Sequence, residues 1–336
     1  LPMPYTLGVD VGGTFTDIFL VNEDNGRIFT AKVPSTPEDS SVGVLNGIER
    51  ACVRSGIVPS EIGHVMHGTT VATNTVLTGT GALVGLVATQ GFRQVLQIAR
   101  SYVPGGLGGW VIYNKSEPMA PLELTVEADE RIGADGAVVR SLEEDSLRQR
   151  LEFLKGRGIE ALTVCLINSF ANATHEQRIR DIALEVMPAI PVSLSSDVIP
   201  EMQEYERAVT TVANSYVRPR VQTYIENLTR ELKSRMGDVK LHVLRSDGGL
   251  ASSSSAAEYP VNLLMSGPAG GVAGAVWIAK QAGYSNLLTI DMGGTSTDVA
   301  LVQDGEAQTR RETTVGDVTV RASSIDVRTV GAGGGS

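Results

Sequence analysis

Two glycine-rich segments far apart in the chain carry the same arrangement of carboxylates and hydroxyls. Residues 7–21 read Leu-Gly-Val-Asp-Val-Gly-Gly-Thr-Phe-Thr-Asp-Ile-Phe-Leu-Val, and residues 288–302 read Leu-Thr-Ile-Asp-Met-Gly-Gly-Thr-Ser-Thr-Asp-Val-Ala-Leu-Val. Both contain Asp-x-Gly-Gly-Thr-x-Thr-Asp, in which all six specified positions agree. A coincidence of this length in one chain is improbable, so the repeat predicts two similar halves with equivalent sites.

The repeated pattern suits the binding of phosphate and magnesium. A Gly-Gly turn between two apolar runs predicts a β-hairpin whose backbone N–H groups and threonine hydroxyls can surround phosphate oxygens. An aspartate that ends the first strand can hold a hydrated Mg²⁺. The alternative is that these are ordinary hairpins without a ligand, in which the aspartates form hydrogen bonds within the turn. The duplication of the motif disfavours this interpretation.

The candidate residues divide by chemistry. Asp10 and Asp291 are the candidate catalytic carboxylates and Mg²⁺ ligands, whereas Asp17 and Asp298 are expected to stabilise the turns. The candidate nucleotide-binding residues are Gly12, Gly13, Thr14 and Thr16 in the first motif and Gly293, Gly294, Thr295 and Thr297 in the second.

The elements around the first motif predict an α/β fold. After the hairpin we expect a strand at 27–33, a helix at 40–54, a strand at 62–67, a helix at 69–77 and a strand at 82–88. This order implies a mixed sheet covered by helices. From residue 142 the alternation resumes, with helices at 142–157 and 174–187, strands at 161–167, 192–194 and 239–245, and a long helical stretch at 201–236 broken near Pro219.

A third glycine-rich segment, at residues 266–275, opens a helix just before the second motif. Pro268 suits the first helical turn, but Gly270, Gly271 and Gly274 each cost about 1 kcal/mol relative to alanine in a helix interior. Close packing against another helix is the favoured explanation. Approach of a ligand to the helix N-terminus is the other.

Composition excludes several classes of protein. The chain of 336 residues carries a net charge of −10, which argues against nucleic acid as the partner. Two cysteines, Cys52 and Cys165, exclude a disulfide scaffold and are expected to be buried thiols. No apolar run reaches the ~20 residues of a membrane span, and no signal peptide is evident, so we expect a reducing, cytoplasmic setting.

The paired motifs resemble the two phosphate-binding hairpins of the actin, Hsp70 and sugar-kinase superfamily. Further segments are similar, in their order and in their residue sequences, to the hydantoinase A/oxoprolinase family, which includes the ATP-binding subunits of acetone and acetophenone carboxylases. These segments are His67–Asn74, Glu204–Arg207, Ser246–Leu250, Ser266–Gly271 and Thr329–Ser336.

The resemblance implies an actin-like (ribonuclease H-like) two-lobe ATPase fold with mixed sheets flanked by helices. The expected first lobe spans residues 1–197, with an insertion around 101–140. Residues 198–336 would hold the connecting helices and the first portion of a second, truncated lobe, so the chain is expected to be part of a longer protein.

The resemblance also implies ATP-dependent hydrolysis of a cyclic amide, of hydantoin or 5-oxoproline type, through phosphoryl activation of its carbonyl. The alternative is the ATP-binding subunit of a ketone carboxylase. ATP and Mg²⁺ are the implied cofactors, a small carbonyl compound the substrate, and a hydantoinase B-type subunit the partner. A non-enzymatic ATP switch is disfavoured by the family-specific segments. The glycine-rich stretch 102–113 is expected to govern substrate choice.

Other polar residues carry competing interpretations. Thr69, Thr70 and Asn74 could contact substrate or phosphate, with His67 as acid, base or orienting donor, but the two threonines could equally cap a helix. Asp247 is a further candidate for substrate contact. For Glu206 and Arg207 a salt bridge on a helix is favoured over catalysis.

Overall fold

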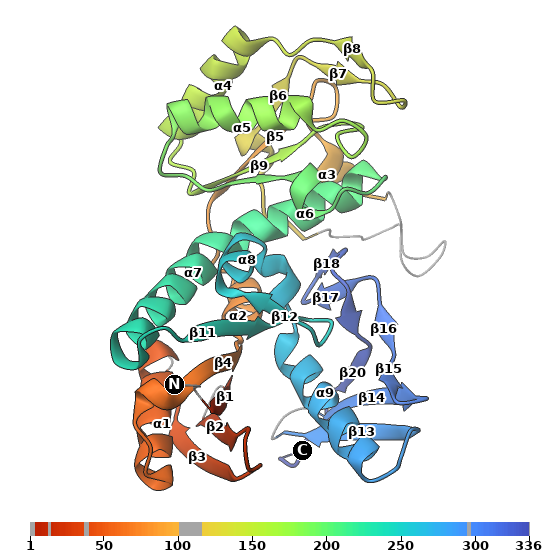
Figure 1. The fold of residues 1–336 in the computed structure, drawn as a ribbon. Helices are drawn as coiled ribbons and strands as arrows, with labels where there is room; N and C mark the ends of the chain where they lie inside the picture. Colours follow the sequence, from red (N-terminus) through yellow and green to blue (C-terminus); the bar gives the residue numbers. More distant parts are fainter. Residues whose placement is uncertain (1–3, 13–14, 37–39, 101–115, 294–296, 336) are drawn as a thin grey trace. The chain divides into compact units, whose positions relative to one another are not determined.

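The computed structural model describes residues 4–12, 15–36, 40–100, 116–293 and 297–335. The chain forms two compact units, each of mixed α/β structure (Figure 1). Unit 1 comprises residues 1–77, 221–315 and 322–336, and unit 2 comprises residues 78–220 and 316–321. These units divide the chain differently from the expected lobes 1–197 and 198–336, and the lobe boundary stays a prediction.

Unit 1 contains a six-stranded mixed sheet in the order β12-β11-β4-β1-β2-β3. β1 to β3 form antiparallel pairs, β4 is parallel to both β1 and β11, and β12 is antiparallel to β11. The strands are β1 (Tyr5–Val11), β2 (Phe15–Asn22), β3 (Ile28–Pro34), β4 (Ile62–Gly68), β11 (Lys240–Leu244) and β12 (Leu250–Ser252). The first motif therefore forms the predicted hairpin.

The expectation of one mixed sheet that includes the strand at 82–88 is wrong for that strand. The strand expected at 82–88 exists as β5 (Val84–Thr89), but it lies in a sheet of unit 2. The neighbour of β4 is β11, in which Val243 pairs with His67. Apolar patterning identifies a buried strand but does not state which strand it pairs with, so nothing local excluded β5.

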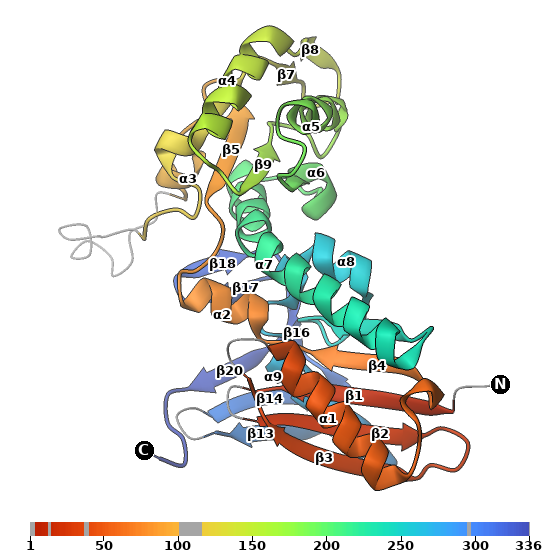
Figure 2. The ribbon, with the colours of Figure 1, turned by 90° about the vertical axis from the view of Figure 1, so that its left-hand side faces the viewer.

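The two faces of this sheet differ. One face is packed under α1 (Ser40–Ser55), as Figure 2 shows. Gly47 permits this contact, because a Cβ there would lie 2.6 Å from Cγ1 of Ile18. On the other face, which we call the open face, Asp10 and Phe19 are exposed. Strand alternation thus places Asp10 away from the helix-covered core.

The second motif forms a second hairpin in another sheet of unit 1. The strands are β13 (Leu287–Met292), β14 (Thr297–Gln303), β15 (Glu306–Ala307) and β20 (Val327–Val330). β14 lies between β13 and β20, and α9 (Ser266–Gln281) packs beside the sheet through Ala269 and Val272 (Figure 1). The second predicted hairpin is therefore also confirmed.

Unit 2 is built on a parallel sheet in the order β10-β9-β5-β6. Its main elements are β6 (Thr125–Ala128), α4 (Glu144–Gly156), β9 (Ala161–Cys165), α5 (Thr174–Val186) and β10 (Val192–Leu194). Leucine, isoleucine and valine side chains of α4, α5 and the strands form its core. β6 falls within the segment 101–140, so part of the expected insertion is a strand of this sheet.

The long helix α7 (Glu204–Met236) is continuous through Pro219, so the predicted break there is wrong. Proline inside a helix costs roughly 3 kcal/mol. Val217 and Val221 are both fully buried, and packing on either side of the proline offsets this cost. Residues up to 220 belong to unit 2, and later ones belong to unit 1.

Shorter elements complete the described chain. The helices are α2 (Val71–Leu77), α3 (Val95–Ile98), α6 (Ser195–Val198) and α8 (Ser253–Glu258), with 3-10 turns at Pro59–Glu61, Leu122–Leu124 and Pro260–Leu263. The strands are β7 (Arg131–Ile132), β8 (Val138–Arg140), β16 (Thr309–Arg310), β17 (Thr313–Val315), β18 (Val318–Val320) and β19 (Ser324–Ile325). Both cysteines are buried and free, as predicted. None of the described helices is long and apolar enough to cross a membrane.

Candidate functional site

Asp10 is the residue around which the candidate site is arranged. It lies next to the end of β1, opposite Asp17 on β2 and opposite Gly68 at the end of β4. A Cβ at Gly68 would lie 3.1 Å from Oδ1 of Asp10, so glycine leaves room for the carboxylate. Hence the ends of two parallel strands and a hairpin turn meet at one carboxyl group.

The electrostatic environment of Asp10 favours a bound cation. The Asp10 side chain is open to solvent on one side, but desolvation by the protein around it is the main cause that raises its pKa, and the negative charges of Asp17 and Asp291 raise the pKa further. The ammonium group of Lys32 opposes them. Among the described residues, none donates a hydrogen bond to the Asp10 carboxylate. A cation would relieve this crowding of negative charge.

Hydrogen bonds within the hairpin and from Ser35 stabilise the first hairpin turn. The Gly12 N–H donates to the Phe15 carbonyl at 3.0 Å, and the Ser35 hydroxyl donates to the Gly12 carbonyl at 2.7 Å. Thr16 is fully buried, with its hydroxyl 3.0 Å from that of Ser35. The structure therefore places Thr16 as a support of the turn, while Gly12 is part of the turn itself.

The second hairpin turn is held by the end of the chain. The Gly334 N–H donates to the Gly293 carbonyl at 2.9 Å, and the Thr297 hydroxyl donates to the Ala332 carbonyl at 2.6 Å. Asp291 is exposed at the end of β13. The predicted terminal glycine loop thus lies against the second motif.

Four of the candidate nucleotide-binding residues, and the stretch expected to govern substrate choice, lie outside the described residues. They are Gly13, Thr14, Gly294, Thr295 and residues 102–113. Asp17 and Asp298 were expected to stabilise their turns, but the described contacts link each of them to a neighbouring strand instead. Asp17 forms an ion pair with Lys32 at 2.9 Å, and the Thr329 hydroxyl donates to Asp298 at 2.6 Å.

His67 points away from Asp10. It pairs in register with Val9, so its side chain lies on the helix-covered face, whereas Asp10 lies on the open face. The His67 ring is fully buried, with Nε2 2.8 Å from the Tyr224 hydroxyl on α7, and Nδ1 has no hydrogen-bond partner among the residues that the structure describes. Burial lowers the pKa of His67 to about 4, an effect that the Val9 backbone partly opposes. In this structure His67 joins β4 to α7 as a neutral imidazole.

The other polar candidates make local contacts. The Val71 N–H donates to the Thr69 hydroxyl at 3.3 Å, and the Asn74 side chain donates to the Thr70 hydroxyl at 3.3 Å. The first contact, to a backbone N–H, fits the capping interpretation of Thr69, whereas the second joins two side chains and caps no backbone group. Asp247 accepts the Gly249 N–H at 3.0 Å and forms an ion pair with Arg245 at 2.7 Å. The described contacts thus occupy the Asp247 carboxylate within its own turn.

Glu206 and Arg207 do not form the expected pair with each other. Glu206 pairs with Arg100 at 2.6 Å. The buried Arg207 guanidinium donates to the carbonyls of Leu166 and Glu201. Consecutive helical residues diverge by about 100°, so each side chain finds a different partner.

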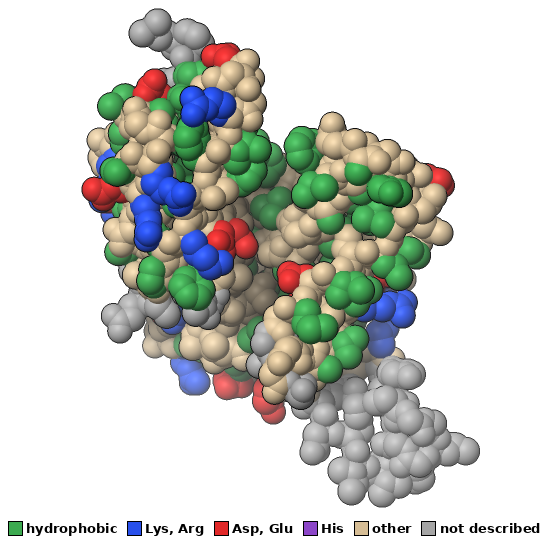
Figure 3. Space-filling model, turned by 90° about the horizontal axis from the view of Figure 1, so that it is seen from below, with side chains coloured by type: hydrophobic (Ala, Val, Ile, Leu, Met, Phe, Trp, Pro, Cys, Tyr) green, Lys and Arg blue, Asp and Glu red, His purple; other side chains and the backbone are tan. Residues whose placement is uncertain are grey.

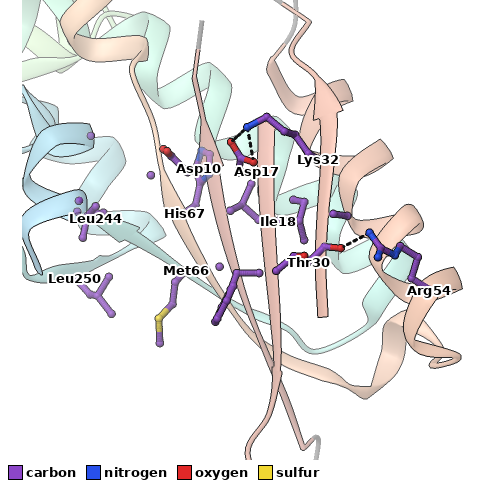
Figure 4. A pocket seen from close by; sticks show the side chains of 18 residues that line it. Asp10, Asp17, Ile18, Thr30, Lys32, Arg54, Met66, His67, Leu244 and Leu250 are labelled. Atoms are coloured by element: carbon purple, nitrogen blue, oxygen red, sulfur yellow. Dashed lines mark hydrogen bonds and ion pairs between the residues drawn. The ribbon is translucent and has the colours of Figure 1, made fainter. Parts of the chain in front are cut away.

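A cavity of about 730 Å³ opens beside Asp10 on the open face (Figure 4). Figure 4 shows Asp17, Lys32 and Arg54 on one side of it and Met66, Leu244 and Leu250 on the other. Seen from below, the surface is hollowed, with acidic side chains at the edge of the hollow (Figure 3).

The glycines of α9 contribute to this cavity, which changes their explanation. A Cβ at Gly270 would meet Cδ2 of Leu244 at 2.5 Å, whereas a Cβ at Gly271 or Gly274 would meet no described atom within 4 Å. The favoured explanation, close packing against another helix, is therefore wrong for these two residues. Gly267, Gly270 and Gly271 line the cavity, which agrees with the alternative that α9 leaves room for a ligand.

The donor set fits Mg²⁺ better than a transition metal. The described residues contain no cluster of three or more His, Cys, Asp or Glu side chains suited to a metal ion. Mg²⁺ needs only one or two carboxylates together with water and phosphate oxygens. Asp10, crowded by negative charge, meets that requirement together with Asp291.

The apolar wall of the site was not among the features predicted from the sequence. Phe19 and Met66 lie in register on either side of Gly8 and are both exposed on the open face. Period-two alternation in β2 placed Asp17 and Phe19 on one face and could have indicated this wall. Met66 could not be located, because it becomes a neighbour of Gly8 only through strand pairing.

Comparison with known sequences places most of the chain in one family. Residues 6–187 match the family described as hydantoinase/oxoprolinase N-terminal region, and residues 207–336 match hydantoinase/oxoprolinase. The chain is 32% identical to caprolactamase subunit alpha of Pseudomonas jessenii, covering 99% of this chain and 48% of that protein. It is 31% identical to 5-oxoprolinase 1 of Arabidopsis thaliana, covering 98% of this chain and 28% of that protein.

Solved structures of this family share the fold of the chain. The crystal structure of the ATP-dependent caprolactamase from Pseudomonas jessenii superposes with a TM-score of 0.87 at 31% identity, covering 98% of this chain and 48% of that one. The nucleotide-free structure of an acetone carboxylase also gives 0.87, at 28% identity and the same coverages. The chain thus spans about half the length of these relatives.

Proposed function

The chain belongs to the hydantoinase/oxoprolinase family, and on that premise we propose that it is the ATP-binding part of an enzyme that hydrolyses a cyclic amide. Membership makes it part of an ATP-dependent enzyme family. The observation that carries the finer proposal is the Asp10 carboxylate, which lies among like charges at the mouth of a cavity. Such a group holds a cation next to a bound small molecule.

The proposed roles follow from this placement. Asp10 and Asp291 would hold Mg²⁺, which supplies neutralisation of phosphate charge when it is bound. The turns at Gly12 and Gly293 would position the ATP phosphates through their backbone donors. The cavity beside Asp10 would hold the carbonyl compound and exclude bulk water. We also propose that the two hairpins belong to an actin-like two-lobe fold.

The proposed chemistry activates an unreactive carbonyl. The amide oxygen attacks the γ-phosphorus, the bond between that phosphorus and ADP breaks, and the amide becomes an O-phosphorylated electrophile. Water then adds to the carbonyl carbon, the carbon–nitrogen bond breaks as the nitrogen takes up a proton, and an acyl phosphate remains. A second water adds to the same carbon, and phosphate leaves with the original amide oxygen, so that a carboxylate is formed. The chain's part is to position and to neutralise charge, which phosphoryl transfer chiefly requires.

An isotope experiment tests this proposal. The full-length protein with its co-purifying subunits is incubated with ATP and hydantoin, 5-oxoproline or a neutral lactam labelled with ¹⁸O at the carbonyl. We expect ADP and ¹⁸O-labelled inorganic phosphate in equal amounts. ATP hydrolysis that no carbonyl compound stimulates would contradict the proposal.

A ketone carboxylase is the second candidate. The acetone carboxylase structure covers this chain as fully as the caprolactamase does and with the same TM-score. Bicarbonate-dependent consumption of ATP with acetone or acetophenone, and AMP rather than ADP as the nucleotide product, would favour it. In either case we propose a hydantoinase B-type partner subunit, because the relatives are subunits of multi-subunit enzymes.

A further inference from the structure

The floor of the cavity beside Asp10 is formed by Gly8, which has no side chain. Gly8 precedes Asp10 by two residues, so both face the open side of the sheet. In register, Gly8 lies between Phe19 on β2 and Met66 on β4. A Cβ at Gly8 would approach no closer than 3.7 Å to Phe19. Glycine therefore leaves a notch of side-chain depth next to the carboxylate.

The walls of this notch are apolar and uncovered. Phe19 is 47% exposed, Met66 is 40% exposed, and Leu250 farther along the same cavity is 45% exposed. Exposed apolar side chains grouped around a concave site next to a reactive group are typical of a pocket for an apolar ligand. The roof comes from Gly270 and Gly271 of α9, which add no polar side chain.

The cations that line the cavity are distant from the notch or already paired. Lys32 lies on β3, two strands from Asp10, and its ammonium contacts both carboxylate oxygens of Asp17 at 2.9 Å. Arg54 donates to the Thr30 carbonyl at 2.8 Å, also on β3. Strands are about 4.8 Å apart, so β3 lies about 10 Å from β1. Thr30 lies two residues along β3 from Lys32, which is the residue of β3 in register with Asp10.

Among the described residues that line the cavity, a substrate carboxylate would therefore find no free cation beside the notch. In 5-oxoproline the carboxylate is attached to the lactam ring, within a few ångströms of the carbonyl that must reach the phosphate. With the ring in the notch, that carboxylate would face Phe19 and Met66. An unpaired charge against apolar groups is strongly unfavourable.

Resting on the proposed function, we infer that the notch between Phe19 and Met66 selects neutral, apolar carbonyl compounds and rejects anionic ones such as 5-oxoproline. The substrate class is a hydrocarbon lactam or, for the carboxylase alternative, an alkyl or aryl ketone. Gly8 sets the depth of the notch and hence the size of the ring that it accepts.

Matched substrate pairs test the inference in the full-length protein with its co-purifying subunits. 2-Pyrrolidone and 5-oxoproline differ only in a carboxylate, as do acetophenone and 4-acetylbenzoate when bicarbonate is present. We expect the neutral member of the accepted pair to give a kcat/KM for ATP consumption at least about tenfold higher. Higher kcat/KM with the anionic member would overturn the inference but leave the proposed function intact. If no carbonyl compound stimulates ATP consumption, the proposed function fails, and the inference fails with it.

Two substitutions test whether the notch determines the substrate preference. Met66→Lys places a cation in the wall and should shift the preference toward the anionic member by roughly tenfold, by raising kcat/KM for that member and lowering it for the neutral one. Met202→Lys, at an exposed methionine outside the cavity, is the matched control and should alter neither. Gly8→Ala should lower kcat/KM for ε-caprolactam more than for 2-pyrrolidone. An unchanged preference in Met66→Lys, or equal losses in Gly8→Ala, would contradict the assignment of the notch.

Discussion

Asp10 and Gly68 face each other across the register of β1 and β4, and a Cβ on Gly68 would lie 3.1 Å from Oδ1 of Asp10. Gly68→Ala should therefore push the carboxylate aside and weaken MgATP binding about tenfold, equivalent to ~1.4 kcal/mol. Isothermal titration with MgATP measures the effect. Gly156→Ala is the control, because a Cβ there meets no described atom within 4 Å. Equal affinity in both variants would contradict a role for this contact.

The substitution Asp10→Asn distinguishes a functional role of the Asp10 carboxylate from a structural one. Loss of the carboxylate should reduce ATP-dependent turnover by roughly 10²- to 10³-fold, the usual effect of removing one electrostatic group from a site. Burial and neighbouring negative charges raise the Asp10 pKa, so the ionised form is unfavourable in the fold. The variant should consequently unfold at the same temperature as the wild type or higher. A lower melting temperature would indicate a structural role, and Asp24→Asn in the exposed β2–β3 turn is the control.

Lys32→Met should change the pH dependence of activity. The ammonium of Lys32 lowers the pKa of Asp10, so its removal raises that pKa further and leaves less ionised carboxylate in mild acid. The acidic limb of the profile of kcat/KM for ATP should move to higher pH. Lys32→Arg keeps the charge and should leave the limb in place. The prediction fails if both variants give the same limb.

His67 makes the fold sensitive to acid. Its pKa is lowered to about 4 from 6.5, so between these values the unfolded chain binds a proton that the folded chain does not. Its contribution to stability is therefore complete above about pH 6.5 and declines as the pH falls toward 4. The total loss is on the order of 3 kcal/mol. Urea denaturation of wild type and His67→Gln across this range should show a weaker pH dependence in the variant.

Glu176 stabilises unit 2 from inside. This fully buried carboxylate accepts hydrogen bonds from the Leu166 N–H, the Ser195 hydroxyl and the Ser196 N–H, at 2.7–2.9 Å. Glu176→Gln turns an amide donor toward one of these donors and should cost about 1–3 kcal/mol of unfolding free energy. Glu185→Gln, which alters an exposed ion pair with Arg148, should cost less than ~1 kcal/mol. Equal costs would show that burial does not decide the effect.

The hairpins and most helices were predictable because short-range patterns determine them. Gly12 must be small, since its own Cβ would lie 3.1 Å from the Phe15 carbonyl, and the alternation in β1 and β2 fixes which side chains reach the core. The candidate carboxylates followed from the same pattern. The duplication of the motif identified both turns without any knowledge of their contacts.

The features of the fold and of the site that could not be predicted depend on contacts between segments far apart in the sequence. His67 was a candidate acid or base, but its register with Val9 turns the ring toward Tyr224 and away from Asp10. Likewise, the apolar wall beside Gly8 exists only because β2 and β4 flank β1. At Pro219 local propensity was overridden by buried neighbours on both sides of the proline.

The pairing of β4 with β11 has a consequence for biosynthesis. Residue 67 meets residue 243 only after the whole segment 78–220 has left the ribosome. Until then one edge of β4 has no partner, whereas the parallel sheet of the intervening segment can already form. Closing so long a loop is entropically costly and slow, and an unpaired strand edge invites aggregation. Nascent chains of this protein should thus depend on chaperones most strongly while that segment is being translated.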